Sequence, residues 1–231
     1  MKKSILILTI FLITKSVFFA QLKFGADLYS RYIWRGINLG GDSPSLQPSL
    51  SYITSGFTFG FWGAYSYPGN GVTYSENDIY ASYTLPTESV GSFTVIATDY
   101  YIPSFGIPFG HYEKNGGAHV IEGGFGYSGP EAFPITFSGY YNLHNDVDNS
   151  VYLQIGYPFT IEDATLSVAL GFVPAKSAYY LSEKASIINF SITAAKPVIV
   201  TEKFTIPINV SYIVNPNQDI SYLAFGAGFT F

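Results

Sequence analysis

The stretch that decides the fold is Ser221-Tyr-Leu-Ala-Phe-Gly-Ala-Gly-Phe-Thr-Phe231. Every second residue from Leu223 to Phe231 is apolar, and the residues between them are small or polar, apart from Tyr222. Successive side chains of a strand point to opposite faces, so this strand has one large apolar face and one smaller, wetter face. A strand that closes a barrel in lipid also has a reason to end on an aromatic residue, which stands in the interfacial girdle. The stretch therefore predicts a membrane β-barrel.

The composition agrees with this hypothesis. The chain has 231 residues, of which 48% are hydrophobic, 18% aromatic and only 12% charged. Soluble domains average about 25% charged residues, so half of the usual solvating charge is missing. Beyond the first twenty residues no apolar run approaches the roughly 18 residues that a membrane helix needs, so the apolar residues are spread in alternation. The absence of cysteine excludes disulfides, thiolate catalysis and cysteine-ligated metals.

Residues 1–20 read as a secretory signal peptide. A basic start at Lys2 and Lys3 precedes an apolar core from Ser4 to Thr14, and a short tail ends at Ala20. Removing this segment takes away three lysines and no acidic residue, which leaves 8 basic against 16 acidic side chains and a net charge of −8. A protein without a basic stripe is not expected to bind nucleic acid.

From Leu22 onward we predict one all-β domain, residues 21–231, that forms an antiparallel up-and-down transmembrane barrel of about twelve strands. The predicted segments are Leu22–Trp34, Ser45–Thr54, Phe57–Tyr67, Tyr74–Leu85, Ser92–Ile102, Ala118–Tyr127, Ile135–Leu143, Val151–Thr160, Ala164–Val173, Ala185–Val200, Lys203–Val214 and Gln218–Phe231. Pro207 lacks the N–H of a ladder bond, so we expect a local bulge there.

The lengths of the connections alternate as well. Short turns and longer loops alternate along the chain. The short turns include Ser55-Gly56 and Glu162-Asp163, and the longer loops include Arg35–Pro44, Pro103–Gly117 and Pro174–Lys184. Short turns at one rim and longer loops at the other are the arrangement of outer-membrane barrels, whereas a secreted β-sandwich has no reason to sort its loops. Both chain ends then fall at the short-turn rim, which is the periplasmic side.

The first third of the mature chain also resembles a known family. Tyr32-Ile-Trp-Arg35-Gly36 is followed by Pro44 and Gln47. The run from Gly56-Phe57 to Gly60-Phe-Trp62-Gly63 comes next, and then Glu76-Asn-Asp78-Ile-Tyr80 with Tyr83. This order is similar to the TorF-type family of porin-like proteins, also known as a Gcw-type family of unknown function. The resemblance implies an outer-membrane barrel in a Gram-negative-type bacterium, and it supplies no substrate.

Charged residues on the inner face are the strongest candidates for a functional site. A charge on the lipid face costs several kcal/mol at mid-depth, so these side chains are expected to face the lumen. The candidates are Asp27, Arg31, Asp78, Asp99 and Glu122. They form either an eyelet that selects ions by sign or a salt-bridged plug, with Arg31 paired to Asp27 or Asp78. Inward tyrosines favour a narrow bore, namely Tyr29, Tyr80, Tyr140, Tyr152 and Tyr222.

Arg35-Gly36 in the first long loop is a second candidate. The resemblance hints at a role for it, and the simpler interpretation is a hairpin corner whose arginine forms a salt bridge with a neighbouring loop. Catalysis has little support, because His111, His119 and His144 have no metal-ligand spacing and no nucleophile motif accompanies them. We predict no catalytic residue, no metal and no cofactor.

The predicted function is passive or weakly selective passage of small hydrophilic solutes, with a mild preference for cations because the inner charges lean acidic. The alternatives are a plugged structural or adhesive barrel and a lipid-modifying enzyme at the rim near His111 and His119. The predicted partners are outer-membrane lipid, the solutes and the barrel-assembly machinery, for which Phe229 and Phe231 form the expected signal. The sequence does not define the oligomeric state.

Overall fold

The structure, a computed structural model, describes residues 20–67, 74–202 and 204–230. The predicted signal peptide lies outside the described residues except for Ala20, and so does Phe231 of the expected assembly signal. Within the described part of the chain, no helix is long and apolar enough to cross a membrane.

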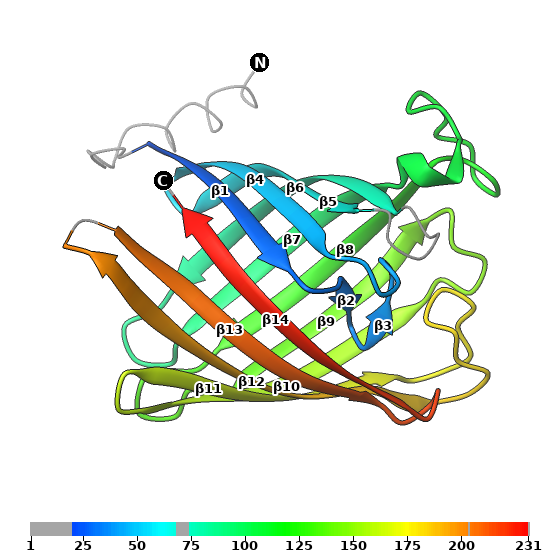
Figure 1. Cartoon of the computed structure of the whole chain (residues 1–231). Coiled ribbons are helices and arrows are strands. Elements are labelled where there is room, and N and C mark those ends of the chain that lie inside the picture. Colours follow the sequence, from blue (N-terminus) through cyan, green and yellow to red (C-terminus); the bar gives the residue numbers. More distant parts are fainter. Residues whose placement is uncertain (1–19, 68–73, 203, 231) are drawn as a thin grey trace, which may run out of the picture.

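Twelve strands of the described chain close into one antiparallel barrel, as predicted (Figure 1). The barrel strands are β1 Gln21–Tyr29, β4 Ser45–Thr54, β5 Phe57–Ser66, β6 Ser75–Pro86, β7 Ser92–Tyr101, β8 His119–Ser128, β9 Thr136–His144, β10 Val151–Ile161, β11 Ala164–Val173, β12 Ser186–Thr201, β13 Phe204–Asn215 and β14 Ile220–Thr230. Each strand pairs with its neighbours in the chain, and β14 pairs with β1 to close the barrel. The predicted segments from Ser45 onward agree with these strands to within two residues at each end.

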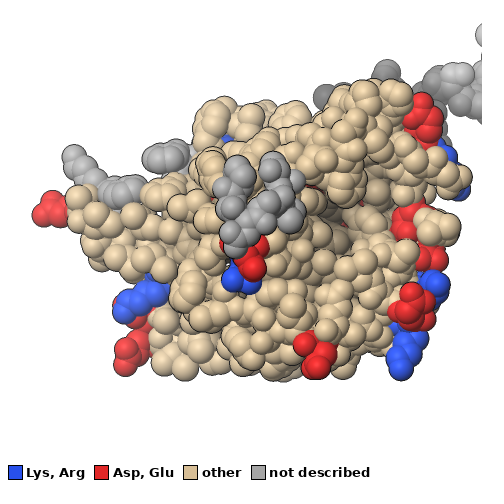
Figure 2. Space-filling model, turned by 45° about the vertical axis from the view of Figure 1, so that its right-hand side comes forward, with Lys and Arg blue, Asp and Glu red and all other residues tan. Residues whose placement is uncertain are grey.

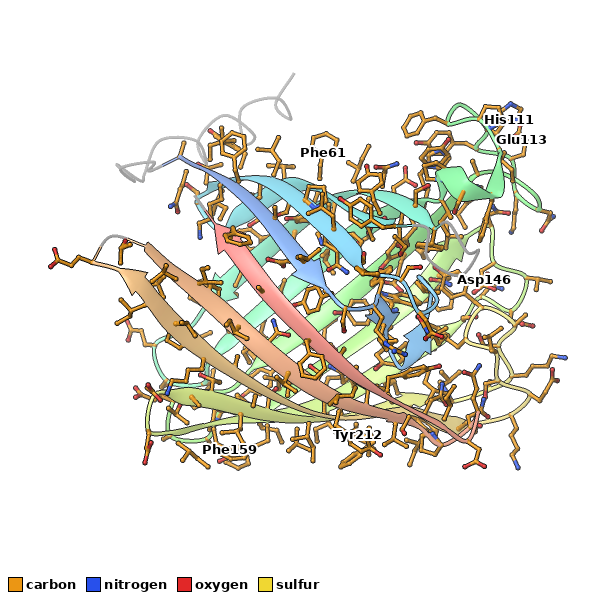
Figure 3. All side chains as sticks on the ribbon, viewed as in Figure 1. Phe61, His111, Glu113, Asp146, Phe159 and Tyr212 are labelled. Carbon is orange, nitrogen blue, oxygen red and sulfur yellow. The ribbon has the colours of Figure 1, made fainter. Side chains whose placement is uncertain are left out.

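The alternating sequence divides the side chains between the two faces of the wall. Large apolar side chains stand exposed on the outside, among them Phe61 of β5, Phe159 of β10 and Tyr212 of β13, which project away from the barrel in Figure 3. In Figure 2 most charged side chains lie at the left and right edges of the view, a red and blue pair lies at the centre below the grey atoms, and most of the remaining surface is uncharged. Exposed apolar patches of this extent mark a surface that contacts lipid or protein rather than water.

The longest loops, 30–44, 102–118 and 174–185, lie at one rim as predicted, but the connection 129–135 at the other rim is longer than 145–150 and 216–219. Ser55-Gly56 and Glu162-Asp163 are two-residue turns, in which Ser55 and Glu162 adopt positive φ angles of 49° and 54°. Both ends of the barrel wall, at the start of β1 and the end of β14, lie at the short-turn rim (Figure 1).

The first predicted segment, Leu22–Trp34, was too long. The barrel strand β1 ends at Tyr29, and the chain then bends into a small separate hairpin of β2 Ile33–Trp34 and β3 Ile37–Asn38. Tyr32, which lies within that predicted segment, is buried against Trp62 and Tyr74. The apolar alternation continues through this stretch because the hairpin also has a packed face, so the pattern alone did not show where the wall ended.

The bulge predicted at Pro207 was wrong. Pro207 pairs in register with Pro197, and the register of β12 and β13 shifts instead between Ile199 and Thr201. Two facing prolines fit a pair that exchanges no hydrogen bonds, in which each missing N–H points to the neighbour on the other side. The described ladders with those neighbours stop at Ala195 and Ile208, so neither proline interrupts a bond.

Glycines facing the lumen make room for the inward tyrosines. Gly60 is paired with Tyr80, Gly124 with Tyr140 and Gly226 with Tyr29. A Cβ at each of these glycines would lie 2.3–2.6 Å from the ring of its partner. The aromatic side chains thus cover the bare backbone of the next strand, which stabilises the register and fills part of the bore.

Candidate functional site

The β2–β3 hairpin folds from the wall into the lumen. Its turn is Arg35-Gly36, with φ angles of 49° and 81°, and positive φ at both central residues is typical of a type I′ turn. At Gly36 a Cβ would lie 2.0 Å from the carbonyl oxygen of Ile188 in β12. Only glycine therefore permits this approach. The hairpin leaves the wall between β1 and β4 and reaches strands on the other side of the barrel.

Arg35 fixes the tip of the hairpin to the far wall. Its guanidinium donates to both carboxylate oxygens of Glu122 in β8, at 2.6 and 2.9 Å, and also to the hydroxyl of Tyr180. Tyr100 donates to the same carboxylate at 2.9 Å. The Glu122 side chain is 1% exposed and the Arg35 side chain 10% exposed, so this is a buried two-point ion pair.

Aromatic rings surround the Arg35 guanidinium. Its central carbon lies 3.9 Å from the ring centre of Tyr140, 4.4 Å from that of Trp34 and 4.8 Å from that of Tyr152. Cation–π contacts of this kind are worth about 2 kcal/mol or more when the charge is desolvated. They compensate part of the cost of taking the arginine out of water.

A second in-folded segment meets the hairpin. The loop between β11 and β12 forms a bridge from Ser177 to Ser182, and this bridge holds Tyr180 fully buried against Ile37, Tyr152 and Ile188. Burial raises the pKa of Tyr180, so its hydroxyl stays protonated. The lumen is therefore constricted at the long-loop rim by two segments that are not part of the wall.

Two acidic side chains of β6 face the hairpin from the opposite side. Glu76 is 3% exposed and accepts a hydrogen bond from Tyr74 at 2.7 Å. Asp78 is 7% exposed, and its Oδ1 has no hydrogen-bond partner among the described residues. Together with Glu122, three buried carboxylates thus share the hairpin region with the single guanidinium of Arg35.

The other candidates from the sequence lie apart. Asp27 faces the lumen in β1, beside Gly228 of β14. Arg31 forms a salt bridge with Asp42 at 3.0 Å, within the first long loop, and not with Asp27 or Asp78 as the plug hypothesis required. Arg35 bonds to a strand of the wall and not only to a neighbouring loop, so the hairpin-corner interpretation described its turn correctly but not its partner.

Asp99 was wrongly placed in the lumen. It is paired with Ile79 and Ile121, and Ile79 is exposed on the outer face. The Thr94-Val-Ile-Ala97 stretch blurs the alternation in this strand, which explains the error. Asp99 bonds Nδ1 of His119 at 2.7 Å and accepts from the hydroxyl of Tyr112 at 2.8 Å, so it secures the loop between β7 and β8.

His119 is held by contacts at both ring nitrogens. Its Nδ1 lies 2.7 Å from Asp99, and its Nε2 lies 2.6 Å from the carbonyl oxygen of Phe109. His111 is exposed and lies 3.5 Å from Glu113, in the loop that projects from the barrel in Figure 3. Across the described residues, no group of three histidine or carboxylate side chains could hold a metal ion.

Two cavities flank the hairpin inside the lumen. One, of about 440 Å³, lies on the side of β12, β13 and β14, and polar side chains such as Gln47, Asn209 and Ser211 line it. The other, of about 350 Å³, lies between the hairpin and strands β5, β6 and β7. Tyr32 borders both, so the hairpin divides the lumen.

Several residues of this region were not predicted. Glu76 lies in the stretch that resembles the family but was not among the predicted lumenal charges, although its position two residues before Asp78 places both on one face of a strand. Tyr179 and Tyr180 lie in a loop, and no pattern in the sequence shows that a loop folds inward. Arg35 and Glu122 are 87 residues apart, so their pairing could not be read from local sequence.

The architecture defines the class of protein: a closed antiparallel barrel with an apolar exterior and a polar, constricted lumen is a porin-type β-barrel. The chain belongs to the family described as bacterial protein of unknown function (Gcw_chp), whose model matches residues 20–223, and this confirms the resemblance seen in the sequence. A search of curated proteins found no match. The solved structure "KdgM porin in complex with disordered oligogalacturonate" is similar in fold, with a TM-score of 0.53 and 9% sequence identity over 92% of this chain and 98% of that one.

Proposed function

We propose that the protein is an outer-membrane channel that passes small hydrophilic solutes through a bore narrowed by the β2–β3 hairpin, with a mild preference for cations. In this proposal the short-turn rim and both chain ends face the periplasm. The observation that carries it is the division of the lumen: the hairpin is fixed by Arg35 and Glu122, yet polar space remains beside it.

The charges of the constriction support the preference for cations. Glu122 is neutralised by Arg35, and Glu76 and Asp78 are buried side by side and do not both ionise, so the hairpin region carries at most one unpaired negative charge. The KdgM porin was solved with oligogalacturonate, an acidic sugar polymer. An acidic constriction repels such a polyanion, so we expect this chain to take cationic or neutral solutes instead.

Conductance in planar lipid bilayers tests the proposal. The purified protein should give small discrete steps, and the reversal potential in a salt gradient should favour the cation. The double variant Arg35→Gln with Glu122→Gln removes the ion pair but leaves a polar amide at each position, so it should loosen the hairpin and raise the conductance.

The possible results separate the alternatives. A silent wild type beside a conducting double variant supports the plugged barrel. Silence of both proteins, once their folding is verified by heat-dependent migration in gels, contradicts any channel function. An anion-selective reversal potential contradicts only the argument from charge.

A further inference from the structure

The larger lumenal cavity, of about 440 Å³, has a lining without net charge. Arg31 is the only charged residue among the described residues that line it, and Asp42 lies 3.0 Å from its guanidinium and offsets its charge. The other polar groups of the lining are amides and hydroxyls, from Tyr29, Tyr32, Gln47, Thr193, Asn209 and Ser211. A charged solute that enters therefore gives up hydration for a lining that offers it no net opposite charge.

The pairing of neighbouring strands produces this lining. Thr193 of β12 is paired with Ser211 of β13, and Ser211 in turn with Ala224 of β14. Asn209 lies two residues before Ser211 and therefore faces the same side of β13. Strand β14 contributes only the small side chain of Ala224 to the lining, whereas β1 beyond it contributes Tyr29. A hollow thus remains over β14, with polar side chains on both sides of it.

The polar groups keep hydrogen-bonding capacity after they have bonded to one another. The hydroxyls of Thr193 and Ser211 are 2.8 Å apart, and a bond between two hydroxyls uses only one of their two O–H donors. The amide nitrogen of Asn209 donates to the hydroxyl of Tyr29 at 3.3 Å, which uses one of the two N–H donors of the amide. All four residues are partly exposed. The lining can therefore both donate to a solute and accept from it.

We propose that this cavity binds a small neutral sugar. The hydroxyls of a sugar both donate and accept, as the groups of the lining do, and an uncharged solute loses no ionic hydration on entry. The rings of Tyr29 and Tyr32 supply apolar surface for the C–H face of the sugar ring. The volume of the cavity lies within the range of roughly 300–1,000 Å³ that is usual for small-molecule sites.

This inference rests on the proposed function, because the sugar must enter the lumen from solution and is one of the neutral solutes expected to pass. The two can nevertheless be tested apart, since binding is measured on the folded protein in detergent and does not require conduction. Sugar binding without conductance would contradict the channel and support the site. Conductance without sugar binding would contradict the site alone.

Saturation-transfer NMR in an amine-oxide detergent, which contains no sugar, measures weak binding directly. D-Glucose should receive magnetisation from the protein, and the response should reach a plateau as its concentration rises. Cyclohexanol has a ring of the same size with a single hydroxyl, and sodium D-glucuronate carries a charge on the same sugar ring, so both should respond more weakly at equal concentration. An equal response to either compound, or no saturable response to glucose, overturns the proposal.

Two double variants locate the response. Thr193→Val with Ser211→Ala removes both hydroxyls of one bonded pair, so neither is left without its partner, and glucose binding should weaken at least about fivefold. Thr84→Val with Thr94→Val is the matched control, because it removes a hydroxyl pair 2.9 Å apart between β6 and β7 that does not border this cavity. The control should bind like the wild type. Unchanged binding by the folded first variant, or equal weakening in both, contradicts the assignment. If the first variant does not fold, the comparison of glucose with cyclohexanol on the wild type decides.

Discussion

Arg35 is the residue on which the interior of the barrel depends. A turn with two positive φ angles presents its guanidinium to a carboxylate on the far wall, and the rings of Tyr140 and Trp34 lie close to it. Removing one partner of a buried pair leaves the other charge uncompensated, which is commonly worth about 3–5 kcal/mol. The neighbouring Gly36 is required as well, because the hairpin can approach Ile188 only where no Cβ is present.

Gly36→Ala should therefore unseat the hairpin while the wall stays closed. The positive φ costs about 1–2 kcal/mol for alanine, and the clash with the Ile188 carbonyl oxygen adds to it. Fluorescence of the adjacent Trp34 in a urea titration measures the loss of hairpin stability. Gly116→Ala is the control, since Gly116 also has a positive φ, of 101°, but nothing lies within 4 Å of its added Cβ. Equal effects of the two substitutions contradict the close approach.

Asp146 gives a prediction about pH at the long-loop rim (Figure 3). Burial raises the pKa of this carboxyl, but hydrogen bonds from Ser150, Asn142 and the Asp148 backbone outweigh it and lower the pKa below its usual value of 3.8. Its contribution to loop stability is therefore complete above the unfolded pKa and is lost as the pH falls through the folded pKa.

Amide hydrogen exchange of the loop between β9 and β10 measures this contribution. The amides of Asp148 and Ser150, which donate to Asp146, should be better protected in the wild type than in Asp146→Asn at neutral pH. The difference should vanish at a pH about two units below 3.8. A difference that persists there contradicts the role of the ionised carboxylate.

Among the described residues, the ladder between β1 and β14, the seam of the barrel, is the shortest in the barrel wall. It runs from Gly25 and Thr230 to Tyr29 and Gly226, whereas the ladder of β1 with β4 covers the whole of β1. The ring of Tyr29 lies over Gly226 at the end of this seam. The joint that closes the barrel thus relies on a side chain as well as on backbone hydrogen bonds.

Gly226→Ala should lower the fraction of closed barrels. Its Cβ would lie 2.3 Å from the Tyr29 ring and 2.8 Å from the amide oxygen of Asn209, so the ring must move away from the seam. Gly126→Ala, whose Cβ would have the Cβ of Thr94 at 3.8 Å as its nearest neighbour, should be tolerated. The fraction of each variant that migrates as folded protein in unheated gels distinguishes Gly226→Ala from Gly126→Ala. Equal fractions for the two variants would contradict the role of the Tyr29–Gly226 contact in closing the barrel.

At this scale the sequence predicts the wall better than the interior. In a strand such as Ala164–Val173, every second side chain faces lipid and must be apolar. The alternation in the sequence therefore indicates which side chains face outward. The packed face of β2 and β3 obeys the same alternation for a different reason, so Tyr32 and Trp34 read as wall residues. The partners of Arg35 and the inward course of Tyr180 depend on contacts between distant segments, which leave no local pattern.

For the molecule as a whole, the two faces of the wall should respond oppositely to charge. Val210 and Ser211 are consecutive in β13, with Val210 exposed on the outer face and Ser211 lining the larger lumenal cavity. Val210→Lys should cost about 2–4 kcal/mol in lipid if it lies near the bilayer midplane, whereas Ser211→Lys faces polar space. Urea-dependent folding into lipid vesicles measures the free energy of unfolding of both variants. A larger loss for Ser211→Lys would reverse the assignment of the faces.

The position of the hairpin has a consequence for engineering. Tyr29 and Ser45 already face each other in the ladder of β1 and β4, so the wall needs only a tight turn between them. The residues between Ser30 and Pro44 form a cassette, and these two end residues hydrogen-bond to the wall at Phe225 and Tyr67. Grafting other hairpins at this junction should alter which molecules a pore admits while the same scaffold is kept, which makes the barrel a starting point for designed nanopores.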